Sequence, residues 1–409
     1  MSAARVAVVG GSLAGLRAAE QLRAAGHTGP VTVLGAEPWL PYNRPPLSKE
    51  ALAEGGAPDA LAARLAFRRR ASIADVDFRL GDPVAAAVLA DRTLVTEAGH
   101  TLGYDGLVVA TGLRPRRLAV PGPSTGRHVL RTVADCHALR AALSGPADVV
   151  VVGAGFVGCE VAGTLHGLGH RVTVVEPAGP PMVRVLGAPV ATAVQRHHEA
   201  AGIRFVIGAG VTAFTGDSRL TGVVLDTGET LPADVVVEAV GSVCNVEWLA
   251  GNDLDLSDGV LTDNHLRAAE RVVAVGDLAR FPNPLVDDVP RRVEHWSIPT
   301  DTAKRAAATL AAELAELAGV TPDLVRNGAP FAPVPSFWSD QLGLRFQSYG
   351  SPALADEVRV EEGDPDHLPG GLLATYHRDG RHLGSLAINL SPARQRELRE
   401  AFHHEGVPA

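Results

Sequence analysis

Lysine is nearly absent from this chain of 409 residues. Of its 37 lysines and arginines, only Lys49 and Lys304 are lysines. Positive charge is scarce too, and the net charge of -9 argues against a general affinity for nucleic acid. No apolar run is long enough to cross a membrane, since the longest, from Val149 to about Leu165, is interrupted by glycines and by Glu160. We therefore expect a cytoplasmic protein with neither a membrane nor a nucleic-acid partner.

Cysteine is scarce as well, and its spacing excludes a class of chemistry. Cys136, Cys159 and Cys244 show neither the CxxC nor the CxxxxC spacing that would place two thiols side by side. We interpret them as small buried apolar residues. They predict no redox-active dithiol and no ligands for an iron–sulfur cluster, and we expect no metal site.

One pattern occurs twice in the chain. Residues 5–37 and 148–177 each contain an apolar strand, a glycine-rich turn, an alanine-rich helix and a second apolar strand followed by an acid. This is the layout of a Rossmann βαβ unit, in which the turn and the helix N-terminus bind a pyrophosphate and the acid binds a ribose. Two such units predict an α/β fold with two dinucleotide-binding domains, and a useful pair of dinucleotides is a flavin and a nicotinamide.

The two copies differ in detail. The first has Ser12 at the central glycine position, and its closing acid, Glu37, lies farther from the glycines than Glu176 does in the second. A carboxylate at Glu176 would repel a ribose 2′-phosphate, so we expect NADH rather than NADPH, although Arg171 and Arg184 lie near enough in sequence to weaken this preference. The other candidate dinucleotide-binding residues are Gly10, Leu13, Ala14 and Gly15 in the first copy, and Gly153, Gly155, Phe156, Val157 and Gly158 in the second.

Two further strand ends carry polar or glycine residues. The segment GLVVATGLRPR predicts a strand that ends at Ala110, Thr111 and Gly112, and RVVAVGDLARF predicts one that ends at Gly276 and Asp277. An aspartate just past a buried strand can bind a polyol such as the ribitol of a flavin. The alternative for Asp277 is a helix cap or a turn.

The C-terminal segment has its own pattern. Residues 344–350 alternate like a half-buried strand, and residues 371–390 predict two strands joined by a turn at Asp379 and Gly380. The stretch that follows Ser391 has helical spacing and a serine cap. We expect a small α/β domain here.

These elements, in this order, resemble the FAD- and NADH-dependent ferredoxin reductases that serve bacterial cytochrome P450 and Rieske oxygenases. The resemblance covers the whole chain, and PPLSK, EHW and FWSDQ are its most specific motifs. It implies an FAD domain at 1–113 and 243–322, an NAD domain at 114–242 and a C-terminal domain at 323–409. The activity it implies is hydride transfer from NADH to FAD, followed by single-electron transfer to an iron–sulfur ferredoxin.

The resemblance also implies roles for single residues. Lys49 and Glu160 would form an ion pair beside the flavin N5, where the ammonium stabilises charge on the reduced flavin. Glu160 follows Gly158 by two residues, so we expect it in the first turn of its helix, where an unpaired carboxylate would repel a pyrophosphate. Pairing with Lys49 would relieve that conflict. Other residues implied around the cofactors are Arg44, Pro45, Val84, Ala110, Thr111, Gly112, Arg131, Gly241, Gly276, Asp277, Glu294, His295, Trp296 and Trp338.

Cysteine placement argues against several related flavoproteins. Glutathione- and lipoamide-type reductases carry CxxxxC near the first helix, thioredoxin reductases carry CxxC in the NAD domain, and NADH oxidases and peroxidases use a lone cysteine where this chain has PPLSK. Rubredoxin and monodehydroascorbate reductases stay open, because neither needs a thiol. A flavin-bearing redox sensor or partner-binding protein similar to apoptosis-inducing factor also stays open.

The partner implied by the resemblance is acidic, so a local basic face is expected. Arg64, Arg68, Arg69 and Arg70 cluster in one segment, and a pair at 291–292 precedes EHW. The alternative is an ordinary solvated helix face. The sequence is consistent with either a monomer or a homodimer.

Overall fold

The computed structural model describes residues 4–317, 319 and 329–405. Contacts divide the chain into two compact units, each built on a largely parallel sheet. The domain boundaries expected from the sequence stay a prediction, since the second unit combines the second βαβ repeat with residues 44–61 and the C-terminal sheet. The first unit comprises Met1–Asn43, Ala62–Arg114 and Cys244–Pro335, and the second comprises Arg44–Leu61, Pro115–Val243 and Ser336–Ala409.

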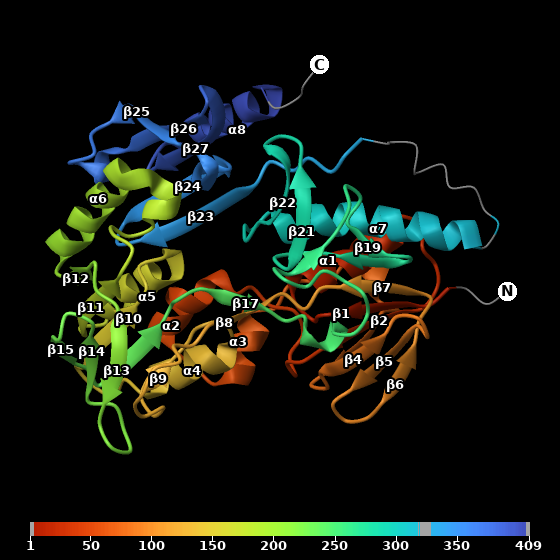
Figure 1. Ribbon diagram of the computed structural model, residues 1–409, viewed down its shortest axis with the longest axis horizontal. Coiled ribbons are helices and arrows are strands. Elements are labelled where there is room, and N and C mark those ends of the chain that lie inside the picture. Colours follow the sequence, from red (N-terminus) through yellow and green to blue (C-terminus); the bar gives the residue numbers. More distant parts are fainter. Residues whose placement is uncertain (1–3, 318, 320–328, 406–409) are drawn as a thin grey trace. The chain divides into compact units, whose positions relative to one another are not determined.

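The first unit contains a six-stranded sheet in the order β19-β20-β7-β1-β2-β3, in which every pair is parallel except β19-β20. Helices α1 and α7 pack against each other and contact the sheet (Figure 1). Both helices are rich in buried alanine, which allows their backbones to approach closely. The bounds are β1 Val6–Val9, α1 Leu13–Ala24, β2 Val31–Gly35, β3 Asp77–Leu80, β7 Gly106–Val109, β19 Arg267–Ala269, β20 Val272–Ala274 and α7 Ile298–Leu317.

Smaller sheets complete the first unit. One has the order β4-β5-β6 and is antiparallel, and the other has the order β18-β21-β22. Strands β8 and β17, at which the chain passes between the units, pair with each other. The bounds are η2 Ala71–Ile73, β4 Val84–Val88, β5 Thr93–Thr96, β6 Thr101–Gly103, β8 Leu113–Pro115, β17 Ser242–Cys244, η3 Glu247–Leu249, β18 Val260–Leu261, β21 Ala279–Asn283 and β22 Asp287–Arg292.

The second unit contains a five-stranded parallel sheet in the order β12-β11-β10-β16-β9. Strand β10 is a run of valines that is buried along nearly its whole length, as expected for a central parallel strand. The antiparallel strands β13-β14-β15 form a further sheet. The bounds are β9 Arg127–His128, α4 Val133–Ala141, β10 Asp148–Val152, α5 Phe156–Gly167, β11 Arg171–Glu176, α6 Val183–Ala201, β12 Arg204–Ile207, β13 Val211–Thr215, β14 Gly222–Leu225, β15 Thr230–Pro232 and β16 Val235–Glu238.

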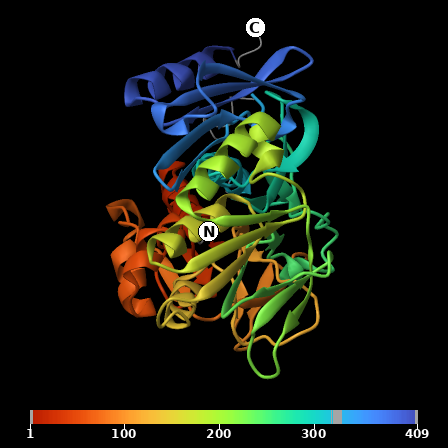
Figure 2. The same cartoon turned by 90° about the vertical axis from the view of Figure 1, so that its left-hand side faces the viewer.

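The C-terminal part of the second unit is a five-stranded antiparallel sheet in the order β23-β24-β27-β26-β25, followed by α8. Helix α6 lies between this sheet and the parallel sheet (Figure 2). The turn at Asp379 and Gly380, both with positive φ, and the Ser391 cap are confirmed. The bounds are β23 Ser336–Gln341, β24 Leu344–Gly350, η5 Pro352–Leu354, β25 Glu357–Gly363, η6 Leu368–Gly370, β26 Leu372–Arg378, β27 Arg381–Ile388 and α8 Pro392–Glu405.

The PPLSK segment forms a short 3-10 helix, η1 (Pro45–Ser48), which leads through Lys49 into α2 (Glu50–Glu54). Both elements contact α5, and α3 (Pro58–Leu65) follows them. No helix in the described residues has the length and apolar character of a membrane span. Within the same residues, no group of histidine, cysteine and carboxylate side chains is placed to hold a metal ion.

Candidate functional site

The first glycine turn joins β1 to α1. Gly10 has a φ of 128°, and a Cβ there would lie 2.1 Å from the carbonyl oxygen of Ala110. A Cβ on Gly15 would lie 1.9 Å from the carbonyl oxygen of Gly10, and Ser12 is the N-cap residue of α1. Both glycines are therefore required by the fold, which brings the N-terminus of α1 beside the end of β7.

The second turn joins β10 to α5 in the same way, with one instructive difference. A Cβ on Gly153 would lie 2.3 Å from the carbonyl oxygen of Ala239, and one on Gly158 would lie 2.1 Å from that of Gly153. Gly155 has an ordinary φ of -75°, and no described atom lies within 4 Å of the Cβ it lacks. The fold does not require glycine at 155, but a pyrophosphate that approaches the backbone would.

Glu176 is the last residue of β11 and lies beside this turn. Its Oε2 accepts a hydrogen bond from the backbone N–H of Ala154 at 2.8 Å, and its Oε1 accepts one from that of Ala178 at 2.9 Å. Arg171, at the start of the same strand, is paired with Asp148 at 2.7 Å. That pairing directs the guanidinium of Arg171 to Asp148 rather than to Glu176.

The strand ends of the first unit bring several predicted flavin-binding residues together. The sheet order places the carboxyl ends of β1, β7 and β20 side by side. A Cβ on Gly276 would lie 2.9 Å from that of Ala14 in the first turn of α1, so the Gly276–Asp277 segment adjoins the first glycine turn. The hydroxyl of Thr111 donates to the carbonyl of Asn245 at 2.5 Å, and the amide of Asn245 donates back to Thr111 O at 3.0 Å.

Glu37 lies two residues past β2 and is held by a residue that the sequence did not point to. The hydroxyl of Tyr42 donates to Glu37 Oε2 at 2.5 Å. Val84 begins β4, and the backbone N–H of Glu97 donates to the carbonyl of Pro83 just before it. These positions fit an adenosine site near the carboxyl end of β2. That role stays a prediction.

The EHW motif lies between β22 and α7 in the first unit. Glu294 accepts a hydrogen bond from Arg292 at 2.7 Å. Burial lowers the pKa of His295 to about 4, so this side chain is neutral near pH 7. Trp296 is 36% exposed and packs near Phe67, with ring centroids 6.3 Å apart.

Other predicted residues belong to the second unit. The guanidinium of Arg44 donates to the carbonyl of Arg131 at 2.8 Å, so these two are brought together. Trp338 is half-buried on β23, and Gly241 has a φ of 95° just after β16. Phe156 stacks edge-on against Phe337, Val157 follows it in the first turn of α5, and Pro45 begins η1. The remaining three predicted residues belong to the first unit, where Leu13 begins α1 and Ala110 and Gly112 follow β7.

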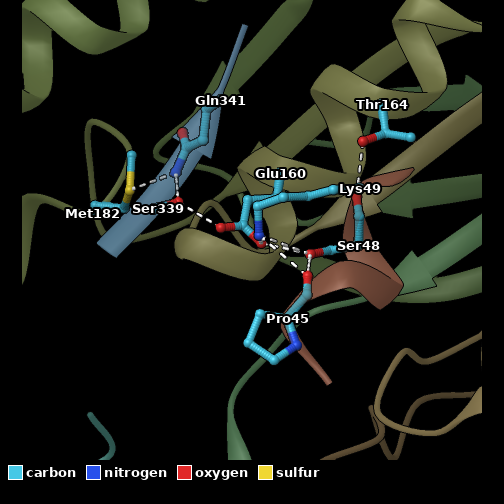
Figure 3. Close-up of polar contacts among 8 residues, drawn as sticks. All are labelled: Pro45, Ser48, Lys49, Glu160, Thr164, Met182, Ser339 and Gln341. Atoms are coloured by element: carbon cyan, nitrogen blue, oxygen red, sulfur yellow. Dashed lines mark hydrogen bonds and ion pairs between the residues drawn. The ribbon is translucent and has the colours of Figure 1, made fainter. Parts of the chain in front are cut away.

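Lys49 and Glu160 form an ion pair within the second unit, with Nζ 2.7 Å from Oε2 (Figure 3). The ammonium also donates to the carbonyl of Pro45 at 3.2 Å and approaches Ser48 Oγ at 3.5 Å. Three acceptors thus face the three N–H groups of one ammonium. The side chains of Lys49 and Glu160 are 17% and 7% exposed, so water screens the pair only weakly.

The expectation that Glu160 lies in the first turn of its helix is wrong. Gly155 is the N-cap and α5 begins at Phe156, so Glu160 is already in the second turn. The unsatisfied N–H groups and the positive end of the helix dipole belong to the first turn. The repulsion between Glu160 and a pyrophosphate at Gly155 is therefore weaker than the spacing suggested.

Glu160 is also the centre of a hydrogen-bond network that sequence reasoning missed. Ser48 donates to Glu160 Oε2 at 2.5 Å, and Thr164, one turn further along α5, donates to the carbonyl of Ser48 at 2.7 Å. Ser339 donates to Glu160 Oε1 at 2.5 Å, and Gln341 donates to Ser339 at 2.9 Å (Figure 3). The E-x-x-x-T spacing on a helix and the S-x-Q spacing on a strand were the available signals.

A pocket of about 620 Å³ opens beside this ion pair. Its walls come from α2, α5 and the turn between β23 and β24, and both Lys49 and Glu160 line it. Glu160 is therefore buried and Lys49 half-buried, yet both border an open space.

All three cysteines are buried, and no disulfide links them. Burial raises the pKa of the Cys159 and Cys244 thiols, which keeps both protonated. The thiol of Cys136 donates to the carbonyl of Leu47 at 3.6 Å. None of these thiols is arranged for redox chemistry.

The basic residues near the two proposed docking segments differ in their surroundings. Arg68, Arg69 and Arg70 are exposed in the stretch after α3, and Arg64 is exposed near its end. Arg70 Nε lies 3.5 Å from Glu20 Oε2. Arg291 and Arg292 are both paired with carboxylates of the same unit, the latter with Asp258 and Glu294. The pair at 291–292 therefore contributes little net positive charge.

Known proteins of one kind match this chain over most of its length. The model of the pyridine nucleotide-disulphide oxidoreductase family matches residues 4–303. The probable ferredoxin reductase CtmF of Castellaniella defragrans is 35% identical over 395 residues, covering 93% of this chain and 89% of the relative. Putidaredoxin reductase CamA of Pseudomonas putida is 32% identical over 366 residues, covering 87% and 82%.

Solved structures that resemble this chain include ferredoxin reductases as well. The ferredoxin reductase for the CYP199A2 system from Rhodopseudomonas palustris has a TM-score of 0.84 at 33% identity and covers 94% of this chain and 91% of that one. The covalent putidaredoxin reductase–putidaredoxin complex gives 0.86 at 29% identity, with coverage of 99% and 94%. With its two glycine turns and its fold, the chain belongs to the pyridine nucleotide-disulphide oxidoreductase family and, within it, to the ferredoxin reductases.

Proposed function

We propose that the chain is a flavoprotein that takes a hydride from NADH and passes single electrons to a small iron–sulfur ferredoxin, which supplies a cytochrome P450 or another oxygenase. The observation that carries this proposal is the state of the cysteines. In a family named for disulphide chemistry, this chain has three buried thiols and no disulfide. Electrons that enter from a nicotinamide therefore leave to an external acceptor rather than to a protein dithiol.

The glycine turns fit the two cofactors. Bound FAD would supply the redox chemistry, because it accepts a hydride and releases electrons singly. The N-terminus of α1, with Gly10, Ser12 and Gly15, would hold the FAD pyrophosphate, and the N-terminus of α5, with Gly155, would hold that of NADH. Asp277 would bind the ribitol, and Lys49 would stabilise negative charge on the reduced ring system while Glu160 holds the ammonium in place.

Glu176 would select NADH over NADPH. Replacing Glu176 with alanine removes the carboxylate that repels a 2′-phosphate, and Arg171 is already paired elsewhere. We expect the ratio of kcat/KM for NADH to that for NADPH to fall roughly tenfold, or ~1.4 kcal/mol. Steady-state kinetics with both nucleotides measure it, and an unchanged ratio would remove Glu176 from the specificity site.

The ferredoxin would dock electrostatically on the exposed arginines that follow α3. These lie in the same unit as the aromatic pair Phe67 and Trp296, of which the tryptophan is partly exposed. Reversing Arg68 and Arg69 to glutamate should raise KM for an acidic ferredoxin roughly tenfold at low salt. Ferricyanide reduction should stay unchanged, and so should KM for ferredoxin in Arg219→Glu, which reverses an exposed arginine in the β13–β14 loop.

High salt gives a second readout of the same surface. Turnover of the native protein should fall steeply with ionic strength, and the double variant should lose most of that dependence. Equal salt sensitivity in both proteins would show that the ferredoxin binds elsewhere.

The function itself is tested by cytochrome c reduction with NADH, with and without ferredoxins from the same genome. Strong dependence on a ferredoxin supports the proposal. Preference for rubredoxin or monodehydroascorbate would support those reductases instead, and slow turnover that ignores every acceptor would indicate a redox sensor. The cytoplasmic location and the choice between monomer and homodimer stay predictions.

A further inference from the structure

We propose that Ser339 is a positioning residue for the Lys49–Glu160 pair. Through Ser339, the C-terminal sheet would fix the orientation of the Glu160 carboxylate, and with it the position of the Lys49 ammonium. This inference rests on the proposed function, because it assigns Ser339 a part in the reaction with NADH. It comes from a contact between two segments that lie 179 positions apart in sequence.

The two oxygens of Glu160 are held from opposite directions. Lys49 and Ser48, both at the end of the PPLSK segment, bind Oε2 at 2.7 and 2.5 Å. In the described part of the chain, the hydrogen bond to Oε1 comes from Ser339 on β23, whose hydroxyl lies 2.5 Å from that oxygen (Figure 3). The plane of the carboxylate is therefore defined by η1 on one side and by the C-terminal sheet on the other.

The direction of the Ser339 hydroxyl is itself set by Gln341. A serine hydroxyl has one hydrogen to donate and lone pairs to accept. Gln341 Nε2 donates to Ser339 Oγ at 2.9 Å, which leaves the hydroxyl hydrogen for Glu160. The two residues are two positions apart on β23 and so share the buried face of the strand. The same amide of Gln341 also lies 3.5 Å from Met182 Sδ.

Burial makes this hydrogen bond consequential. Ser339 is 0% exposed, Gln341 is 3% exposed and Glu160 is 7% exposed, so bulk water does not readily replace a lost donor. A charged acceptor that loses a buried donor is left unsatisfied. Removing the Ser339 hydroxyl would let the carboxylate turn about its remaining partners, and the ammonium of Lys49 would move with it.

The experiment compares Ser339→Ala with Ser339→Thr, which keeps a hydroxyl, and with a matched control. Ser348 on the adjacent strand β24 is also 0% exposed, and its hydroxyl has no hydrogen-bond partner among the described residues. Ser348→Ala therefore makes the same substitution in the same sheet without touching Glu160. The measured quantities are the limiting rate of flavin reduction by NADH, the Kd for NADH, and the infrared carboxylate band that disappears in Glu160→Gln.

For Ser339→Ala we expect the limiting rate to fall about tenfold, or ~1.4 kcal/mol, with little change in Kd. The Glu160 infrared band should shift, even without NADH present. Ser339→Thr should restore the rate, Ser348→Ala should match the native protein, and Ser339→Ala should add little in a Glu160→Gln background.

Three results would overturn the inference. They are a normal rate and an unshifted band in Ser339→Ala, an equal loss in Ser339→Thr, or a full additional loss in the Glu160→Gln background. The inference rests on only one step of the proposed function, the reduction of bound FAD by NADH. Failure of that step is distinguishable, because the native protein would then show no flavin reduction by NADH at all, whereas a different electron acceptor would leave this test unchanged.

Discussion

Lys49→Ala is expected to slow the reduction of bound FAD by NADH at least tenfold, or ~1.4 kcal/mol. The ammonium of Lys49 is the cation of a pair whose carboxylate is only 7% exposed, and it also bonds the carbonyl of Pro45. Its loss removes positive charge from the proposed hydride-transfer site and leaves Glu160 buried without a counter-ion. Breaking such a pair typically destabilises a fold by about 3–5 kcal/mol, so a lower Tm is expected as well.

Anaerobic stopped flow at saturating NADH measures the rate, and the only other lysine of the chain provides the control. Lys304 is exposed on α7, in the first unit, and Lys304→Ala should leave the rate and the Tm as they are. A Lys49→Ala protein that is reduced as fast as the native one would show that the ammonium plays no part in hydride transfer.

Gly155→Val is expected to weaken NADH binding by roughly tenfold to a hundredfold, since hydrogen bonds to a charged pyrophosphate contribute about 1.5–3 kcal/mol each. The backbone of Gly155 has a φ that any residue adopts, and no described atom lies near the missing Cβ. The variant should therefore fold with a native Tm while its side chain fills the space of the ligand. Isothermal titration with NADH measures Kd.

Two glycines serve as comparisons. Gly145 also has open space around its missing Cβ but lies away from the turn, so Gly145→Val should bind NADH normally. Gly158→Ala should instead lower the Tm, because its Cβ would lie 2.1 Å from Gly153 O. Normal NADH affinity in Gly155→Val would contradict the assignment of this turn to the nicotinamide cofactor.

The local elements were predictable from the sequence. The two βαβ units follow from valine-rich strands and from glycines such as Gly10 and Gly153, whose turns admit no Cβ. The hairpin at Asp379 and Gly380 follows from turn chemistry. The family resemblance, drawn from PPLSK, EHW and FWSDQ, is confirmed by relatives that cover most of the chain.

The setting of Glu160 was not predictable to the same degree. Its turn was misjudged because the second glycine of the motif, Gly155, caps the helix and starts it earlier than the spacing to Gly158 suggested. Ser339 was missed because it bonds Glu160 across 179 positions, a contact that no sequence periodicity indicates, and Gln341 was missed with it because it acts through Ser339. Contacts between site residues that lie far apart in sequence can be identified only once the fold is known.

The most direct test of the account is an anaerobic titration of the purified, FAD-loaded protein with NADH, followed by addition of an oxidised ferredoxin. The account predicts that NADH bleaches the flavin absorbance and that the ferredoxin restores it while becoming reduced. A colourless preparation that takes up no FAD, or a bound flavin that NADH leaves oxidised, would contradict it.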